Sequence, residues 1–469
     1  MEEKFKILSG AIGYDAKTQI SHLVVPVPSL VEKKGVWRVI NEPYLVNSEY
    51  EKWPLTPDEQ KARNIFLESQ AQFPIGKPYW AAEDINKFVQ EKGMPKVDPF
   101  TDIFEPICDI LDSTIDFHEP TDSLLITAWI IGTYMLPVFD AFPYMFISGT
   151  RGSGKTKILE IASRLAFNAV MTSNSTPSSL FRVIESTSAT VLMDEGEMLT
   201  SRDDSLEMRL MLNAGYRRNN PVSRTNKDTH QVQWFNVFSP KMIAAINPLD
   251  PTLRSRCLTI TMVRTANKEK GNKRINDNTA NWQGLRNSLY RYSLQCMAEV
   301  YEILNHDEEV SVLDCRQNEL WLPLLAVSKH LNLYVPATAF EALRVRALFV
   351  NEDDESLDDW HKSILFSLRD IVSVAREYTI KEIKVRVATY IEDAEELQKM
   401  TSRWIGAALS RFGLKKGRRK EEGNTYLVSP GEIDDLLVRY QLKTAPPEHP
   451  EDAEEESGGG DTPQASLSI

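Results

Sequence analysis

The chain has 469 residues, 42% of them apolar, which is the composition of an ordinary soluble protein. This length exceeds the size at which one hydrophobic core stops growing, so we expect two to four domains. The net charge of −13 is unevenly distributed, because residues 445–469 hold seven acids and no Lys or Arg, whereas residues 401–420 hold seven Lys and Arg and no acid. The overall acidity therefore does not exclude a nucleic-acid partner.

We do not expect a membrane protein, a secreted protein or a zinc-binding protein. The first residues lack the pattern of a signal peptide, and the longest apolar run, Leu124–Phe139, is shorter than the roughly 20 residues of a membrane span. The four cysteines lie far apart and form no CxxC pair, which argues against structural zinc and against a disulfide framework. We expect a cytoplasmic protein without membrane contact.

Residues 1–96 mix strand-like runs with a polar helical stretch near Pro57–Gln72, and they predict an α+β region without an assigned role. Two apolar helical stretches, Phe100–Ile115 and Pro120–Phe139, form a helical lead-in over residues 97–142. From residue 143 to 265, strands and helices alternate. This alternation predicts an α/β fold with a parallel sheet and crossover helices.

The segment 143–265 begins with the pattern of a phosphate-binding loop. Residues 149–156 read GTRGSGKT, which matches GxxxxGK[ST], and they lie between an apolar strand and apolar residues at helical spacing. In such a loop, backbone N–H groups surround the phosphates, the lysine reaches the β and γ oxygens, and the hydroxyl binds Mg²⁺. The predicted nucleotide contacts are Gly149, Thr150, Arg151, Gly152, Ser153, Gly154, Lys155 and Thr156.

A pair of acids follows another apolar strand. Residues 189–193 form a buried-looking run, and Asp194 and Glu195 come directly after it. At this position Asp194 is expected to hold Mg²⁺ together with Thr156, and Glu195 to polarise the attacking water. The adjacent Asp and Glu indicate hydrolysis of ATP rather than nucleotide storage.

Polar residues lie between two further strands. The short strand "KMIAAI" ends before Asn247, which is placed to orient the water near the γ-phosphate. The turn "DPTLRSRC" then carries two arginines ahead of a strand at residues 258–262. Arg256 is the first candidate for a finger that reaches a neighbouring subunit's γ-phosphate, since such a residue stabilises the charge that develops in phosphoryl transfer. Arg254 is the second candidate, and a surface ion pair is the alternative for both.

The order of these elements resembles the AAA+ ATPase module over about residues 143–350. The hairpin before Asn247 and "LRSRC" after it, which places Arg256 at the finger position, resemble segments of minichromosome-maintenance and superfamily-three helicases. The stretches "TPSSLFRVIE", "MLNAGYRR", "FSPKMIAAI" and "RQNELWLPLLAVSKHL" resemble a poorly characterised family of plasmid, phage and archaeal ATPases linked to primase-helicase replication proteins. The resemblance implies an AAA+ core at 143–265, a helical lid at 266–350 with Arg316 near the nucleotide, and a hexameric ring.

Residues 215–238 form a loop and hairpin between the acid pair and Asn247. By the resemblance, this segment faces the ring's channel, where single-stranded DNA would lie. The cations expected to meet phosphates are Arg217, Arg218, Arg224 and Lys227. Trp234 and Phe235 are neighbours on the returning strand and point to opposite faces, so one of them packs inward. For Trp234 we expect core packing, with base stacking as the alternative.

Residues 357–440 form a smaller unit, and residues 441–469 form an acidic tail that is expected to be disordered. "TIKEIKVRVATYI" and "MTSRWIGAALSRFGL" predict helices and "KKGRRKEEGNTYLVS" predicts a basic β-hairpin, which together indicate a winged helix that meets duplex DNA. The predicted DNA contacts are Arg403, Lys415, Lys416, Arg418, Arg419 and Lys420. A winged fold used only for protein contact is the alternative.

These features predict an ATP- and Mg²⁺-dependent hydrolase that acts on DNA, with a replication-type ring helicase as the leading interpretation. The expected fold is an α/β AAA+ P-loop module with a helical lid, preceded by an α+β region and followed by a winged helix. Two alternatives stay open. One is an ATP-switched replication initiator or loader that does not unwind DNA, and the other is an AAA+ ATPase that remodels proteins.

Overall fold

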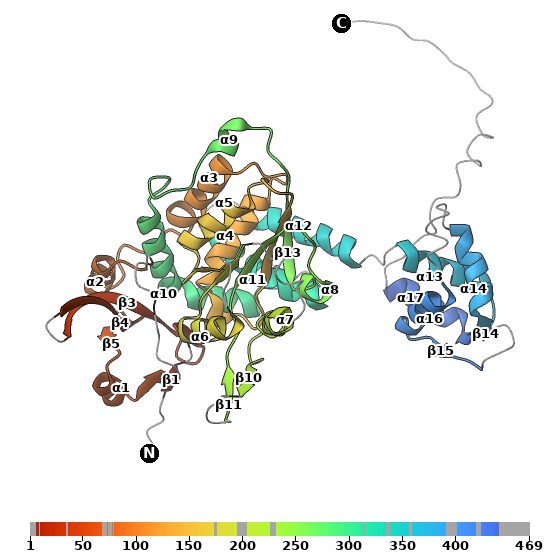
Figure 1. Cartoon of the computed structure of the whole chain (residues 1–469), viewed down its shortest axis with the longest axis horizontal. Coiled ribbons are helices and arrows are strands. Elements are labelled where there is room, and N and C mark those ends of the chain that lie inside the picture. Colours follow the sequence, from red (N-terminus) through yellow and green to blue (C-terminus); the bar gives the residue numbers. More distant parts are fainter. Residues whose placement is uncertain are drawn as a thin grey trace, which may run out of the picture. The chain divides into compact units, whose positions relative to one another are not determined.

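The structure is a computed structural model of the chain (Figure 1). It describes residues 6–8, 10–33, 36–67, 73, 77, 79–172, 176–194, 204–225, 231–311, 313, 315–333, 338–355, 359–390, 401–418 and 424–439. The chain divides into two compact units, Met1–Phe349 and Val350–Ile469. The predicted C-terminal tail lies outside the described residues.

The first unit begins with an antiparallel sheet. Its strands pair in chain order and are β2 (Ile12–Asp15), β3 (Ile20–Lys33), β4 (Val36–Asn47) and β5 (Lys52–Pro54), while β1 (Lys6–Leu8) pairs in parallel with β6 (Ile65–Leu67). The helix predicted at Pro57–Gln72 is shorter than expected. Helix α1 (Pro57–Arg63) ends at Asn64, whose φ of 52° is left-handed, and β6 follows.

Residues 1–96 are predicted as a separate region, but the structure joins them to the rest of the first unit. Trp80, ahead of α2 (Ala82–Gln90), stacks on Tyr290 with the ring centroids 5.6 Å apart. Ser21 of β3 donates a hydrogen bond of 3.2 Å to the carbonyl of Leu294. The N-terminal region therefore packs on α10 (Trp282–His306), which follows the central sheet in the sequence.

A five-stranded parallel sheet forms the centre of the first unit, which confirms the predicted α/β class. Its strand order is β13-β7-β12-β9-β8, with β7 (Tyr144–Gly149), β8 (Val170–Thr172), β9 (Val191–Met193), β12 (Lys241–Ala245) and β13 (Cys257–Met262). The three inner strands are almost entirely buried, as parallel strands covered by helices require. Their carboxyl ends meet at one edge, which is where such sheets bind ligands.

Helices and one hairpin connect these strands. They are α5 (Lys155–Leu165) after β7, α6 (Pro177–Thr187) before β9, α7 (Asp204–Ala214) and the hairpin β10 (Val222–Thr225) and β11 (Val232–Phe235) before β12, and α8 (Pro251–Arg254) before β13. The buried residues of α5, from Ile158 to Leu165, recur at helical spacing. They pack this helix on β9 and β12, which fixes its first turn beside the sheet edge.

Further helices lie before and after the sheet in the sequence. Before it come α3 (Glu105–Thr114), which continues a π-helical turn, and α4 (Asp122–Thr133), which is shorter than the predicted helix because a 3₁₀ turn follows at Leu136–Val138. After it come α9 (Lys268–Asn272), α10 (Trp282–His306), α11 (Cys315–Asn332) and α12 (Thr338–Glu355). Within the described ranges, none of the helices has both the length and the apolar character that crossing a membrane requires.

The second unit has its own small sheet and core. Its described elements are α13 (Asp359–Ile371), β14 (Arg376–Thr379), α14 (Ile380–Val387), α16 (Ser402–Arg411), β15 (Lys415–Lys416), β16 (Thr425–Val428) and α17 (Pro430–Arg439). The sheet is antiparallel in the order β14-β16-β15. Thr379 and Thr401 cap α14 and α16 by accepting hydrogen bonds from backbone N–H groups. Both predicted helices and the predicted hairpin strands are therefore present.

Candidate functional site

The glycine-rich loop joins β7 to α5 at the carboxyl edge of the sheet. Gly149 has a φ of 154°, Gly152 a φ of 79° and Gly154 a φ of 98°, which are conformations that other residues rarely adopt. Because α5 begins at Lys155, the N–H groups of Lys155 and Thr156 have no acceptor inside the helix, whereas that of Lys157 donates to the Gly154 carbonyl at 3.0 Å. These groups remain available to an anion at the helix N-terminus.

The Lys155 side chain folds back over the loop. Its Nζ donates to the carbonyls of Gly149 at 2.6 Å and Thr150 at 3.0 Å, and it lines a pocket at the sheet edge. Ser153 is buried, and its hydroxyl has no hydrogen-bond partner among the described residues. A phosphate oxygen at the loop would satisfy this hydroxyl and the first-turn N–H groups, so the loop fits a phosphate-bearing ligand.

Thr156 and Asp194 meet in space, as the sequence predicts. The Thr156 hydroxyl donates to Asp194 Oδ2 at 3.2 Å, although the two residues are 38 positions apart. Both line the same pocket, and Asp194 follows β9 directly. A hydroxyl beside a carboxylate is an oxygen pair that suits Mg²⁺. Glu195, the predicted catalytic base, lies outside the described residues.

The pocket has a volume of about 710 Å³, which is in the range of small-molecule sites. Its described lining is Thr114, Ile115, Asp116, Arg151, Gly152, Ser153, Gly154, Lys155, Thr156, Lys157, Asp194, Ala244, Ala245, Ile246, Thr265, Lys270 and Gly271. Four of these side chains are cationic and two are anionic, which gives a formal charge of +2. The pocket therefore favours an anionic ligand.

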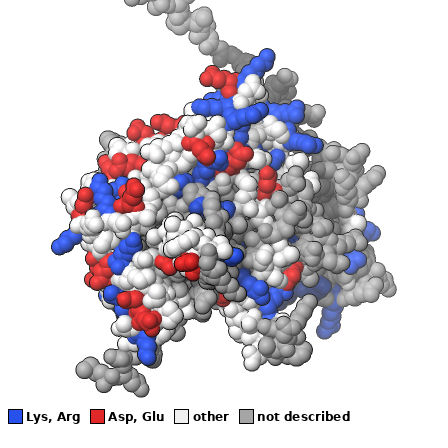
Figure 2. Space-filling view, turned by 60° about the vertical axis from the view of Figure 1, so that its left-hand side comes forward, with Lys and Arg blue, Asp and Glu red and all other residues white. Residues whose placement is uncertain are grey.

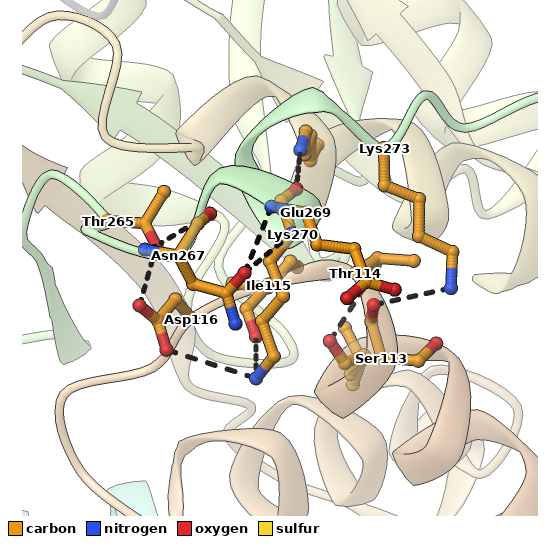
Figure 3. Close-up of polar contacts among 11 residues, drawn as sticks. Ser113, Thr114, Ile115, Asp116, Thr265, Asn267, Glu269, Lys270 and Lys273 are labelled. Atoms are coloured by element: carbon orange, nitrogen blue, oxygen red, sulfur yellow. Dashed lines mark hydrogen bonds and ion pairs between the residues drawn. The ribbon is translucent and has the colours of Figure 1, made fainter.

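The segment after β13, residues 264–273, lines the pocket through Thr265, Lys270 and Gly271, and we call it the strap (Figure 3). Thr265 Oγ1 donates to Asp116 Oδ2 at 2.6 Å. Lys270 Nζ donates to the Ile115 carbonyl at 3.1 Å and lies 3.9 Å from Asp116 Oδ1. These bonds tie the strap to the chain just beyond α3.

The strap also bonds to the glycine-rich loop and the helix after it. Lys157 of α5 donates to the carbonyls of Lys270 at 2.6 Å and Gly271 at 3.0 Å, and burial lowers the pKa of Lys157. Arg264 Nε donates to the Arg151 carbonyl at 3.2 Å. The strap thus joins the glycine-rich loop and α5 to the chain just beyond α3.

Sequence reasoning did not identify the strap. The available indication was the density of cations in residues 264–274, which are Arg264, Lys268, Lys270, Lys273 and Arg274. Figure 2 shows Lys and Arg side chains gathered at the upper end of the face, the end at which α9 lies in Figure 1. Lys270 of this cation-rich segment also lines the pocket.

We expect Gly149→Ala to destabilise the first unit. An added Cβ would lie 2.3 Å from the Met262 carbonyl oxygen and 2.8 Å from Ser153 Oγ. Overpacking of this kind costs about 1–3 kcal/mol, so the urea midpoint of the first unit should fall. The control is Gly271→Ala, whose Cβ meets the Thr265 methyl at 3.3 Å. Equal midpoints for the two variants would contradict the described loop geometry.

Asn247 lies near the pocket without lining it. Ala244, Ala245 and Ile246, at the end of β12, belong to the described lining. Asn247 comes next, and its side chain is exposed. The structure therefore brings the strand end to the site, while the predicted role of Asn247 in orienting water stays a prediction.

Arg256 and Arg316 lie together, and neither belongs to the described lining of the pocket. Arg316 Nη1 donates to the Ser255 hydroxyl at 2.8 Å, and Arg256 donates to the Thr252 carbonyl. Burial, and then the charge of Arg316, lower the pKa of Arg256. The hydrogen bond to Ser255 places Arg316 at the Arg256 turn, and its expected position near the nucleotide stays a prediction. Arg254 is exposed.

Arg218 has a structural role, which corrects its predicted contact with DNA. Its guanidinium donates to the carbonyls of Leu136 at 3.0 Å, Pro137 at 2.6 Å and Phe139 at 2.8 Å. Burial lowers the pKa of Arg218. These carbonyls belong to the 3₁₀ turn after α4 and to the residue that ends it, so the side chain is bound to that turn and is not free to meet a phosphate.

Two other cations of this region are paired with acids. Arg217 is bonded to Glu319, and Arg224 to Glu207. A phosphate would have to displace these carboxylates, so both residues are weaker candidates for DNA contact than the sequence suggests. Lys227 lies outside the described residues.

Trp234 is exposed, so the expectation that it packs in the core is wrong. Its exposed fraction is 64%, and that of Val232, on the same face of the hairpin, is 56%. Phe235 takes the inward position with 9% exposed, and its ring stacks on Phe181 with the centroids 6.0 Å apart. The hairpin thus presents an indole ring and a valine to solvent.

The basic side chains of the second unit are exposed where they are described. These are Arg403 at the start of α16, Lys415 and Lys416 of β15, and Arg418. Arg419 and Lys420 lie outside the described residues. Contact between these side chains and DNA stays a prediction.

Cys296, Glu299 and His330 place potential metal ligands within 4.8 Å of one another. His330 Nε2 lies 2.8 Å from Glu299 Oε2, and its Nδ1 lies 2.9 Å from the Tyr292 hydroxyl. Lys96 donates to the other carboxylate oxygen of Glu299 at 3.0 Å. Burial raises the pKa of Cys296 to about 12, so its thiol is protonated. Hydrogen bonds therefore account for this cluster.

Comparison with known protein families found no family model that matches this chain, and comparison with curated proteins found no significant match. The functional argument therefore depends on the residues of the pocket and on the surfaces around it.

Proposed function

We propose that this chain is an AAA+ ATPase that couples ATP hydrolysis to movement along DNA, and that it acts as a replication-type ring helicase. The observation that carries the proposal is the meeting of Lys155, Thr156 and Asp194 at a pocket with a formal charge of +2. A triphosphate complements this charge, and the first turn of α5 provides N–H groups for its oxygens.

Each residue of the pocket has a stated role in this proposal. The loop N–H groups and Lys155 bind the phosphates, and Thr156 and Asp194 hold Mg²⁺, which neutralises phosphate charge when it is bound. Glu195 takes a proton from the attacking water, whose oxygen bonds to the γ-phosphorus as the bond from that phosphorus to the β–γ bridging oxygen breaks. ADP and phosphate are the products, and Asn247 orients the water.

Arg256 and Arg316 are proposed to act on the nucleotide of a neighbouring subunit. In the described part of the chain, their hydrogen bonds go to neutral oxygens, those of Thr252 and Ser255, and the two guanidinium groups repel each other. An anion from another subunit would relieve this repulsion and would gain two charge-assisted contacts. This arrangement supports a ring, for which a hexamer is proposed.

DNA is proposed to bind at two surfaces. The hairpin offers the exposed Trp234 to the bases of a single strand, since every base has a face on which an indole can stack. The exposed cations of the second unit offer contacts to the phosphates of a duplex, in a winged-helix arrangement.

We expect Trp234→Ala to weaken single-stranded DNA binding by about tenfold, because stacking of one base contributes about 1–3 kcal/mol. The measurement is the change in anisotropy of a labelled oligonucleotide at fixed salt. Trp37→Ala is the matched control, since Trp37 lies on β4 with the same exposed fraction of 64%. Equal losses in both variants would argue against a specific role for the hairpin.

The exposed cations of the second unit also suit a second candidate, an ATP-switched initiator or loader that binds DNA without unwinding it. Displacement of a labelled strand from a forked duplex separates the two candidates. The helicase proposal expects ATP-dependent displacement. Binding of DNA without strand displacement would favour the loader. The absence of any DNA binding at low salt would favour an ATPase that remodels proteins, in which Trp234 and Val232 would contact a polypeptide.

A further inference from the structure

Lys241 is a fully buried lysine that holds three segments of the first unit together. It is the first residue of β12. Its Nζ donates to the carbonyls of Gly215 at 3.4 Å, Val237 at 3.1 Å and Ser239 at 3.0 Å, and to the Ser239 hydroxyl at 3.1 Å. In the described part of the chain it has no carboxylate partner, so the ammonium is held by neutral oxygens alone.

The surroundings are built closely around this ammonium. A Cβ added at Gly215 would lie 2.6 Å from Lys241 Nζ and 2.3 Å from the Val237 carbonyl oxygen, so only glycine permits the approach. The ring of Tyr144, from β7, lies beneath the ammonium with its centroid 4.8 Å from Nζ. A cation over an aromatic face is a favourable contact in a buried site.

The position of Lys241 relates the hairpin to the pocket. Gly215 precedes β10 and Val237 follows β11, so one nitrogen binds both roots of the hairpin. The other end of this five-residue strand is Ala245, which lines the pocket with its neighbours Ala244 and Ile246. A short buried strand thus has the hairpin's roots at one end and the pocket at the other.

We propose that Lys241 is a positioning residue that couples the pocket to the β10–β11 hairpin, because its ammonium clamps both roots of the hairpin to β12. Displacement of the carboxyl end of β12, when the bound nucleotide changes, would then move the hairpin as one body. The inference rests on the proposed ATPase and DNA-binding function, which it deepens by naming the mechanical link.

The charge on Lys241 makes this link sensitive to pH. Burial lowers the pKa of Lys241 to about 7. The phenols on this side are those of Tyr144 and of Tyr216, whose rings have centroids 6.2 Å apart, and burial raises the pKa of both, so they stay neutral between pH 6 and 8.5. When Lys241 loses its proton, its amine becomes neutral and keeps two N–H donors for the four acceptors around it. The hydrogen bonds that hold the hairpin roots should therefore weaken as the pH rises through 7.

The experiment compares Lys241→Met with Lys77→Met in the full-length chain. Lys77 is the matched control, because burial also lowers its pKa and it donates to one backbone carbonyl, that of Ala169, at 3.0 Å. Hydrogen exchange reports on the hairpin without requiring ATPase activity. We expect the amides of β10 and β11 to exchange at least about fivefold faster in Lys241→Met, with those of β7 and β13 unchanged.

ATP turnover supplies the functional measurement. In Lys241→Met, the KM for ATP and the turnover without DNA should stay within about twofold of wild type, while stimulation by single-stranded DNA should fall at least about fivefold. Unchanged stimulation, or a parallel loss of basal and stimulated turnover, would overturn the coupling role. If wild type has no ATPase activity, the proposed function fails, while the hydrogen-exchange result still tests the clamp.

A second experiment keeps Lys241 in place and varies the pH, so that the inference can be tested even if Lys241→Met does not fold. His230→Asn serves as the background, so that the imidazole of the hairpin segment does not titrate. The ratio of DNA-stimulated to basal turnover should fall at least about threefold between pH 6 and pH 8.5. A flat ratio would overturn the inference.

Discussion

Replacing Lys155 with alanine is expected to lower ATP turnover by about 100-fold or more, since removal of one preorganised donor to a transferring group typically costs that much. Lys155 lines the pocket, and its Nζ is held by the carbonyls of Gly149 and Thr150 at the loop. Alanine removes the charge while leaving the backbone N–H groups in place. The variant should therefore fold, retain measurable nucleotide binding and lose turnover, as measured by phosphate release.

Lys157→Ala is the matched control for this variant. Lys157 lines the same pocket, but its Nζ bonds to the strap carbonyls of Lys270 and Gly271. Its loss should change turnover by no more than about 30-fold, because its two bonds contribute about 1 kcal/mol each. Equal effects of the two substitutions, or full turnover in Lys155→Ala, would contradict the assignment of the loop lysine.

Replacing Arg256 with alanine is expected to lower turnover in the assembled protein by about 1,000-fold, the effect of an arginine that stabilises charge in phosphoryl transfer. Arg256 and Arg316 lie outside the described lining of their own subunit's pocket. Nucleotide affinity measured on a single subunit should therefore stay unchanged. Arg254→Ala is the control, because Arg254 is exposed on the same turn and should alter turnover little.

Mixed assemblies test whether Arg256 acts between subunits. Subunits with Glu195→Gln lack the base, and subunits with Arg256→Ala lack the finger, so each is inactive alone. In a mixture, some interfaces pair an intact pocket with an intact Arg256, and turnover should be partly restored. Absence of any restoration in rings of normal mass would contradict a role in trans.

Local patterns predicted the central sheet and the loop well. Residues 149–156 combine glycines that permit positive φ with a strand before and a helix after, and each of these features acts over a few residues. The contact between Thr156 and Asp194 was also predictable, because carboxyl ends of parallel strands meet at one edge. Secondary structure and topology together place these residues with little help from the remaining chain.

Contacts between distant segments were not predictable in this way. The strap depends on the bond from Thr265 to Asp116, 149 residues apart, and no local pattern specifies that pairing. Arg218 was assigned to DNA from its charge and its place in a predicted loop, but carbonyls some 80 residues away bind it. Strand alternation showed that one of Trp234 and Phe235 packs inward, whereas the choice between them is set by Phe181 on another element.

The most direct test of the account is ATP turnover measured with and without single-stranded DNA, on protein whose mass in the presence of ATP is recorded at the same time. The account predicts a ring-sized particle whose turnover rises at least about fivefold with DNA and is lost in Lys155→Ala. Turnover that is absent, or that is unaffected by DNA at low salt, would contradict the proposal of a DNA-dependent motor.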